Sequence, residues 1–203
     1  MNPQLEISRL LDLMPASGRM FTKLVSKPQQ PQVIATRFPA PWNREARAIS
    51  INFSLWFQLS QPEQDLLLLR AVTGLTNIRW FKPDLYQGAA LAGLLGLGVE
   101  LFQTDVIGIL VAGGLTTMAV TQVWRNNRST GQELAADEAA LKVAERRGYS
   151  RKEAARYLMT GLEAAMQLEG RSSLDFIELV RSQNLKAIAT LSPVSIPEKV
   201  RQR

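Results

Sequence analysis

Apolar residues recur every three to four positions in several stretches of the chain. Over residues 5–14 this spacing leaves the charged side chains on other faces, a pattern that predicts a short amphipathic helix. In the second half, a Ser or Thr followed three residues later by Glu has the spacing of a capping box and precedes further amphipathic stretches. Gly148 and Gly170 occupy C-cap positions, as expected at helix ends. These signals predict helices over 131–147, 151–169 and 173–183, the last capped by Ser173.

The segment 48–53 alternates apolar and polar residues, which is the two-residue period of a half-buried β-strand. Ser60 and Glu63 follow with the spacing of a capping box, so a helix is expected from there to about Thr76. The prolines and glutamines within 27–42 argue against a continuous helix and predict an extended connector.

Two apolar runs, over 85–102 and 106–123, dominate the middle of the chain. Each is close to the lower limit of about 17 to 25 residues for a bilayer-spanning helix. Basic residues flank the pair, and the turn between the runs has none, so the positive-inside rule places both chain ends in the cytoplasm. The sequence therefore predicts a transmembrane hairpin over 85–124. Two buried helices of a soluble core are the alternative.

The chain contains neither cysteine nor histidine. Without cysteine there are no disulfides, thiolate nucleophiles or Cys-ligated metals. Without histidine, a catalytic triad of the usual kind and a His-ligated zinc site are excluded. The net charge of +6 suits an anionic membrane face or nucleic acid, and the apolar hairpin favours the membrane. The N-terminus lacks a signal-peptide pattern, so no cleavage is expected.

A short motif follows the apolar hairpin, where Glu133, Ala136 and Asp137 open the next helix. Together with the order of strand, capped helix, apolar hairpin and helix, this motif resembles the HtpX-like membrane zinc metalloproteases. In that family a strand precedes a helix bearing the H-E-x-x-H motif, and a later E-x-x-A-D helix supplies the third zinc ligand. The resemblance implies a zincin-like domain.

Zinc catalysis of this kind requires two imidazoles one helical turn apart, with a glutamate between them as general base. Aligned with that pattern, Arg70 and Gly74 stand at the histidine positions and Ala71 at the glutamate position. We therefore expect a vestigial site with no catalytic residue, cofactor or metal. Arg70 is expected to pair with Glu133 or Asp137, so that a guanidinium replaces the metal cation. Surface charges on two separate helices are the alternative.

The burial of Arg70 decides how much this pairing contributes to stability. If the pair is buried, loss of Arg70 is expected to cost about 3 to 5 kcal/mol, because carboxylates would be left uncompensated.

Two further segments, 6–20 and 81–88, are similar to a cyanobacterial membrane-protein family of unknown function. This second resemblance implies a photosynthetic bacterium and a thylakoid or plasma membrane. It implies no activity.

These features predict a mainly α fold with a small β element, in which a transmembrane hairpin is inserted in a zincin-like, mostly helical cytoplasmic domain. The expected divisions are an N-terminal helix and proline-rich connector at 1–47, a cytoplasmic domain at 48–84 and 125–185, the hairpin at 85–124, and a basic tail at 186–203.

The expected function is that of a noncatalytic, pseudoprotease-like integral membrane protein, which acts as a scaffold or as an assembly and quality-control factor for membrane protein complexes. Its expected partners are the lipid bilayer and other membrane proteins, with nucleic acid disfavoured and a small-molecule substrate left open. Two alternatives remain: a histidine-independent enzyme that uses carboxylates, and a basic protein that binds lipid surfaces or nucleic acid.

Overall fold

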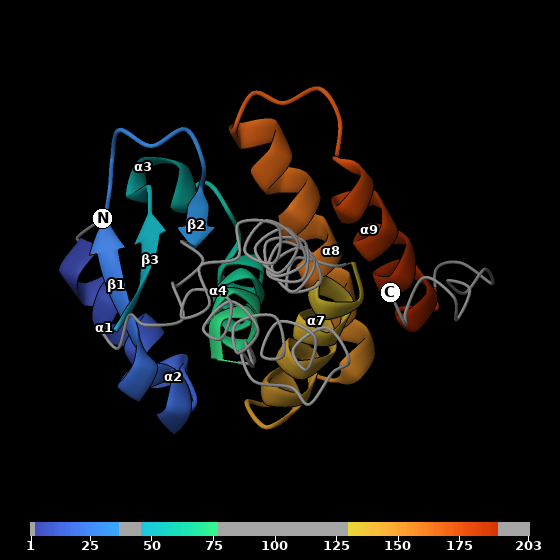
Figure 1. Cartoon of the computed structure of the whole chain (residues 1–203), viewed down its shortest axis with the longest axis horizontal. Helices are drawn as coiled ribbons and strands as arrows, with labels where there is room; N and C mark the ends of the chain where they lie inside the picture. The colour runs from blue at the N-terminus through green and yellow to red at the C-terminus, as the bar shows by residue number, and fades with distance from the viewer. Residues whose placement is uncertain (1–2, 37–45, 77–129, 191–203) are drawn as a thin grey trace, which may run out of the picture. The chain divides into compact units, whose positions relative to one another are not determined.

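The computed structural model of the 203-residue chain describes residues 3–36, 46–76 and 130–190. These ranges belong to one compact unit. They form a mainly α structure with a small three-stranded sheet (Figure 1).

The first half of this unit combines short helices with the sheet. Its elements are α1 (Pro3–Leu13), α2 (Ala16–Phe21), β1 (Thr22–Ser26), β2 (Ile34–Thr36), β3 (Arg47–Ile51), α3 (Phe53–Trp56) and α4 (Gln61–Thr76). The strand order is β1-β3-β2. β3 pairs in parallel with β1 and antiparallel with β2, so β2 is an edge strand of this sheet.

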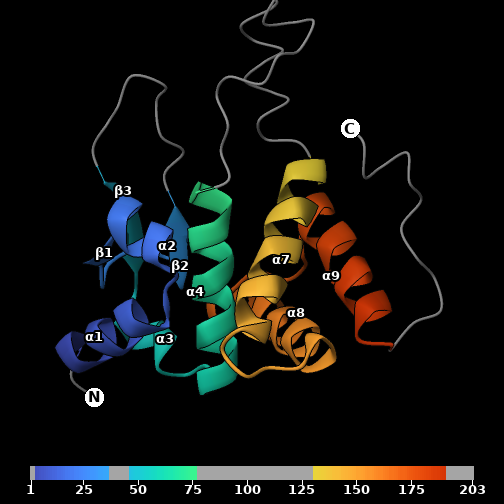
Figure 2. The ribbon, with the colours of Figure 1, turned by 90° about the horizontal axis from the view of Figure 1, so that it is seen from below.

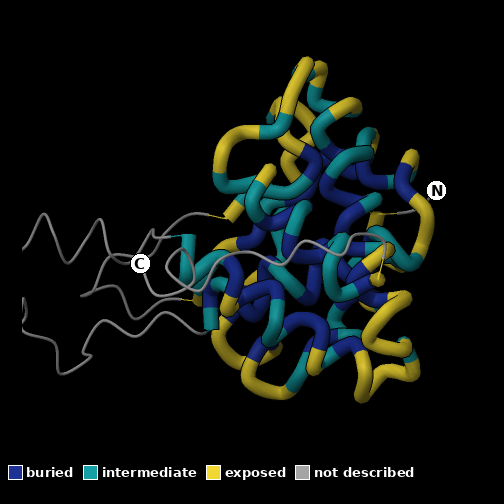
Figure 3. Tube along the Cα trace, turned by 90° about the vertical axis from the view of Figure 1, so that its right-hand side faces the viewer, coloured by how far each residue is buried: buried dark blue, intermediate teal, exposed yellow. Residues whose placement is uncertain are grey.

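The second half of the unit is helical, with α7 (Thr130–Glu145), α8 (Arg151–Leu168) and α9 (Phe176–Ile188). α4 lies between these helices on one side and the sheet with α1, α2 and α3 on the other (Figure 2). The run Leu66–Leu69 is buried all round the helix, as is usual for a helix at the centre of a core. Buried residues are concentrated inside the unit and exposed ones on its outside (Figure 3).

The close approach of α8 to α4 depends on Gly161. A Cβ atom at this position would lie 3.3 Å from side-chain atoms of Glu63 and Leu67 on α4. A larger residue would therefore push the two helices apart.

The predicted helices at 5–14, 60–76, 131–147 and 151–169, and the strand at 48–53, are confirmed to within two residues at each end. Ser150 and Glu153 form the predicted capping box of α8. Gly148 and Gly170 have φ angles of +96° and +70°, the left-handed conformation of a C-cap glycine.

The predicted start of the last helix is wrong. α9 begins after Asp175 rather than after Ser173, because Asp175 and Glu178 form a reciprocal capping box. The described part of the predicted connector, 27–36, contains no helix, but it includes the short strand β2. The sequence patterns also missed β1 and the helices α2 and α3.

The prediction of a transmembrane fold is corrected by the helices that the structure describes. Within 3–36, 46–76 and 130–190, no helix has both the length and the apolar character needed to cross a membrane. The apolar residues of α4, α7 and α8 pack against one another instead. The fold class with an inserted transmembrane hairpin, and the assignment to an integral membrane location, are therefore withdrawn. The predicted spans at 85–124 lie outside the described residues.

Candidate functional site

The junction of α4 and α7 positions Arg70. One turn further along α4, a Cβ atom at Gly74 would lie 3.8 Å from the Cβ atom of Ala136 on α7. The Thr73 hydroxyl donates a hydrogen bond of 2.9 Å to the Ala136 carbonyl oxygen. These contacts hold the two helices close together, so the long Arg70 side chain reaches the first turns of α7.

Arg70 forms ion pairs with both carboxylates that the sequence proposed. Its Nη2 atom contacts Oε2 of Glu133, and its Nε atom lies 3.6 Å from Oδ1 of Asp137. The side chain of Asp137 is fully buried, whereas those of Arg70 and Glu133 are 21% and 34% exposed. The predicted pairing is therefore present, with a buried carboxylate on one side and a partly solvated one on the other.

Arg181 on α9 is the site residue that the sequence analysis missed. Its Nε and Nη2 atoms each donate a 2.8 Å hydrogen bond to Asp137, the bidentate geometry in which guanidinium binds carboxylate most strongly. The Arg181 side chain is only 6% exposed. No pattern in the sequence marked it, because only the packing of α9 on α7 brings it to Asp137.

We refer to Arg70, Glu133, Asp137 and Arg181 as the Arg70 cluster. In this cluster the fully buried carboxylate of Asp137 contacts two guanidinium groups, while Glu133, the second carboxylate, is partly solvated. Burial, followed by the nearby charge of Arg181, lowers the pKa of Arg70 to about 10 against the opposing effect of Asp137. Arg70 stays charged at neutral pH.

Arg70 is also incompletely hydrogen-bonded. Among the buried side-chain nitrogen and oxygen atoms of the residues described, Arg70 Nε alone has no hydrogen-bond partner. Oδ1 of Asp137 lies 3.6 Å from this nitrogen, just beyond hydrogen-bond distance, so Nε has an ionic contact with a carboxylate but no close hydrogen bond.

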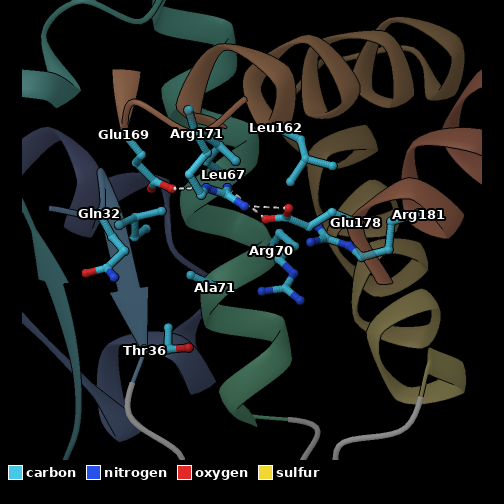
Figure 4. Close-up of a pocket in the computed structure, with 12 residues that line it drawn as sticks. Gln32, Thr36, Leu67, Arg70, Ala71, Leu162, Glu169, Arg171, Glu178 and Arg181 are labelled. Carbon is cyan, nitrogen blue, oxygen red and sulfur yellow. Dashed lines mark hydrogen bonds and ion pairs between the residues drawn. The ribbon is translucent and has the colours of Figure 1, made fainter. Parts of the chain in front are cut away.

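A cavity of about 330 Å³ borders the Arg70 cluster, between the edge strand β2 and the helices α4, α8 and α9. Its lining consists of Gln32, Ile34, Thr36, Leu67, Arg70, Ala71, Leu162, Ala165, Glu169, Arg171, Glu178 and Arg181. Figure 4 shows Arg70 and Arg181 close to each other on one side, with Arg171 between Glu169 and Glu178 above them.

Arg171 is bound by two carboxylates of the cavity. It pairs with Glu169 at 3.0 Å and with Glu178 at 2.7 Å. Burial raises the pKa of Glu178, but the hydrogen bonds from Arg171 and the Asp175 backbone outweigh it, so that the net pKa lies below its ordinary value. Glu178 is therefore held as a carboxylate.

The residues at the α4–α7 junction do not fit a zinc ion. Ala71 and Gly74 offer no metal ligand, and the carboxylates of Glu133 and Asp137 are paired with guanidinium groups. In the described ranges, no group of three or more histidine, cysteine, aspartate or glutamate side chains could hold a metal. Since catalytic zinc takes three protein ligands, no zinc chemistry is assigned here.

A second charged cluster lies five residues earlier on α4 and contains Glu6, Arg9, Asp65 and Tyr149, which we call the Asp65 cluster. Asp65 accepts hydrogen bonds from Arg9 Nη1 and from the Tyr149 hydroxyl, the latter at 2.8 Å. Arg9 also donates two hydrogen bonds to Glu6. This cluster joins α1, α4 and the α7–α8 turn.

Comparison with known proteins identifies a family and no activity. No curated protein and no solved structure matches the chain. A family model matches residues 8–149, a range that includes Arg70, Glu133 and Asp137 and ends before α8. Because this match covers more than half of the chain, the protein belongs to the DUF3318 family, which is described as a protein family of unknown function.

Proposed function

We propose that this protein is noncatalytic and acts as a binding or scaffolding module, in which a guanidinium stands where a related metalloprotease would hold its metal. The observation that carries the proposal is the ion pair of Arg70 with Glu133 and Asp137 across the α4–α7 junction. In this reading the two helices keep the relative placement of a protease site, and their contacts serve binding. The role we favour is scaffolding, assembly or quality control of protein complexes.

An enzyme that uses carboxylates is the alternative, and the cavity argues against it. General acid catalysis by a carboxyl group needs a raised pKa, whereas the pKa of Glu178 is lowered through its contacts with Arg171. Glu169 is also bound to Arg171 and accepts a hydrogen bond from the Val33 backbone. Both carboxylates of the cavity are thus held by structural partners.

The direct test is an assay of peptide hydrolysis by the purified full chain, with and without added Zn²⁺. We expect no hydrolysis in either condition. Hydrolysis that copurifies with the protein and stops on addition of a chelator would contradict the proposal.

A second experiment tests the protease-like placement of the helices. In the triple variant Arg70→His, Ala71→Glu, Gly74→His, the missing motif is restored opposite Glu133. We expect stoichiometric Zn²⁺ binding by calorimetry. Loss of an outer-shell partner weakens metal affinity roughly 10- to 100-fold. When Glu133→Gln is added to the triple variant, we expect a larger loss of Zn²⁺ affinity than this. A folded triple variant that binds no zinc, or binds it equally well without Glu133, would contradict the protease-like placement of α4 and α7.

A further inference from the structure

The cavity beside the Arg70 cluster has the size and lining of a small-molecule site. Its volume of about 330 Å³ lies at the lower end of the roughly 300 to 1,000 Å³ usual for ligand pockets. Leu67, Leu162 and Ala165 give it an apolar wall, and arginines from α4 and α9 meet at one side (Figure 4). Seven of the twelve lining residues are polar and five of these are charged, so the cavity combines an apolar wall with polar groups that can orient a ligand.

The charges around the cavity favour an anion at that side. Asp137 is the buried carboxylate for two guanidinium groups, those of Arg70 and Arg181. Glu133, the other carboxylate of Arg70, is partly solvated, so water screens its charge. Glu178 also acts on Arg70 and Arg181, but it is bound by Arg171. Two guanidinium groups therefore meet at this side of the cavity with one fully buried carboxylate.

Unused hydrogen-bond donors point the same way. The guanidinium of Arg70 has five N–H bonds, more than its ionic contacts with Glu133 and Asp137 occupy, and its side chain is 21% exposed where it lines the cavity. A carboxylate placed in the cavity beside Arg70 would accept hydrogen bonds from the exposed part of this guanidinium. Charge-assisted hydrogen bonds of this kind are about twice as strong as neutral ones.

The rest of the lining limits the charge of the ligand. Glu169 and Glu178 border the same cavity and repel a second negative charge. A dianion such as a phosphate monoester is therefore disfavoured relative to a monoanion, and the apolar wall suits a hydrocarbon body.

We propose that the cavity binds a small monocarboxylate with an apolar body, whose carboxylate group lies against Arg70 and Arg181 and whose hydrocarbon part lies against Leu67, Leu162 and Ala165. This inference rests on the proposed noncatalytic role, because it treats the site as one that binds a ligand without converting it.

The test is calorimetric titration of the full-length protein with hexanoate at neutral pH and low salt, beside two other six-carbon probes, hexanamide and hexyl phosphate. We expect saturable binding of one hexanoate, with hexanamide and hexyl phosphate each at least about tenfold weaker. Equal binding of hexanoate and hexanamide, tighter binding of hexyl phosphate, or absence of hexanoate binding would each overturn the proposal.

Two variants locate the site. Arg70→Lys keeps the charge but loses the planar fork of donors, so we expect hexanoate affinity to fall at least about tenfold. Ala165→Phe fills the apolar side, and we expect the same loss while the charges stay in place. The control Arg9→Lys lies in the Asp65 cluster and should change the affinity less than about twofold. Unchanged hexanoate affinity in folded Arg70→Lys and Ala165→Phe variants would overturn the placement of hexanoate in this cavity.

The same samples separate this proposal from the proposed function. Hexanoate that does not bind, in a protein that hydrolyses no peptide, refutes the ligand and leaves the noncatalytic role standing. Hydrolysis of peptide by the wild-type protein refutes the noncatalytic role, whether or not hexanoate binds.

Discussion

The Asp65 and Arg70 clusters lie on the same helix and differ in how completely their charges are satisfied. Around Asp65, hydrogen bonds from Arg9 and Tyr149 balance one buried carboxylate. Around Arg70, one buried carboxylate faces two guanidinium groups, a nitrogen lacks a hydrogen bond, and a cavity adjoins. The first arrangement is what a fold needs for stability. The second places two arginines beside an open cavity, which is where a ligand is expected.

Removal of Asp137 should have the largest effect on stability. Asp137→Ala removes the carboxylate shared by the buried Arg181 and the partly exposed Arg70. We therefore expect the free energy of unfolding to fall by about 3 to 5 kcal/mol, measured by urea denaturation. The control is Glu138→Ala, the next residue of α7, whose surface pair with Arg151 should contribute no more than about 1 kcal/mol. Equal effects of the two variants would contradict the cluster's burial.

Removal of the charge at Asp65 should have a smaller effect, because Arg9 keeps its hydrogen bonds with Glu6. We expect Asp65→Asn to lower the free energy of unfolding by about 1 to 3 kcal/mol, the cost of leaving a buried donor poorly matched. The exposed Asp12 provides the control, since Asp12→Asn should stay within about 0.5 kcal/mol. A larger loss of unfolding free energy in Asp65→Asn than in Asp137→Ala would contradict this order of effects.

The Tyr149 hydroxyl should make the Asp65 cluster sensitive to alkaline pH. Burial and the hydrogen bond to Asp65 raise the pKa of Tyr149. Because the folded pKa lies above the unfolded value of about 10, this stabilisation is complete below about pH 10 and is lost as the pH rises through the folded pKa.

We therefore expect Tyr149→Phe to lower the free energy of unfolding by about 0.5 to 1.5 kcal/mol at neutral pH, and the difference from wild type to shrink above pH 10. Denaturation at a series of pH values measures both. The control Tyr157→Phe keeps the Tyr149 hydroxyl and should retain the wild-type alkaline loss. A pH-independent difference in Tyr149→Phe would show that the hydroxyl's ionisation is not coupled to folding.

Replacement of Arg70 should have the smallest effect on stability. Asp137 keeps its bidentate bond to Arg181, and an apolar side chain of similar length avoids a new buried charge, so Arg70→Met should cost less than about 1 kcal/mol. The sequence-based estimate of about 3 to 5 kcal/mol assumed that Asp137 has no other cation.

A double-mutant cycle with Arg70→Ala and Glu133→Ala should give a coupling of about 0.2 to 1 kcal/mol, since both side chains are partly exposed. A coupling near zero would show that the ion pair of Arg70 and Glu133 does not stabilise the fold. A loss above 3 kcal/mol in Arg70→Met would make the Arg70 cluster a structural one, like the Asp65 cluster.

Local patterns in the sequence predicted the elements that have local causes. Ser150 with Glu153 and the two C-cap glycines fix helix ends through neighbouring residues, so their spacing was informative. β2 has only three residues, too short for a period to be read. The apolar runs at 85–124 suggested a membrane from hydropathy alone, and they lie outside the described residues.

The candidate site was predictable only where a motif marked it. Glu133 and Asp137 belong to a short recognisable motif, which pointed to Arg70. Arg181 lies 44 residues from Asp137 in the chain, and Arg9 lies 56 residues from Asp65. Such pairs follow from how helices pack rather than from a repeat or spacing, and the cavity follows from the same packing.

Nuclear magnetic resonance of the arginine Nε–H groups tests the central contrast most directly. In ¹⁵N-labelled protein, the signals of Arg70 and Arg9 can be assigned with the variants Arg70→Lys and Arg9→Lys and followed during titration with hexanoate. We predict that the Arg70 signal shifts in a saturable manner as its guanidinium gains an acceptor, while the Arg9 signal stays fixed. A fixed Arg70 signal, or equal shifts of both, would contradict the assignment of one cluster to binding and the other to stability.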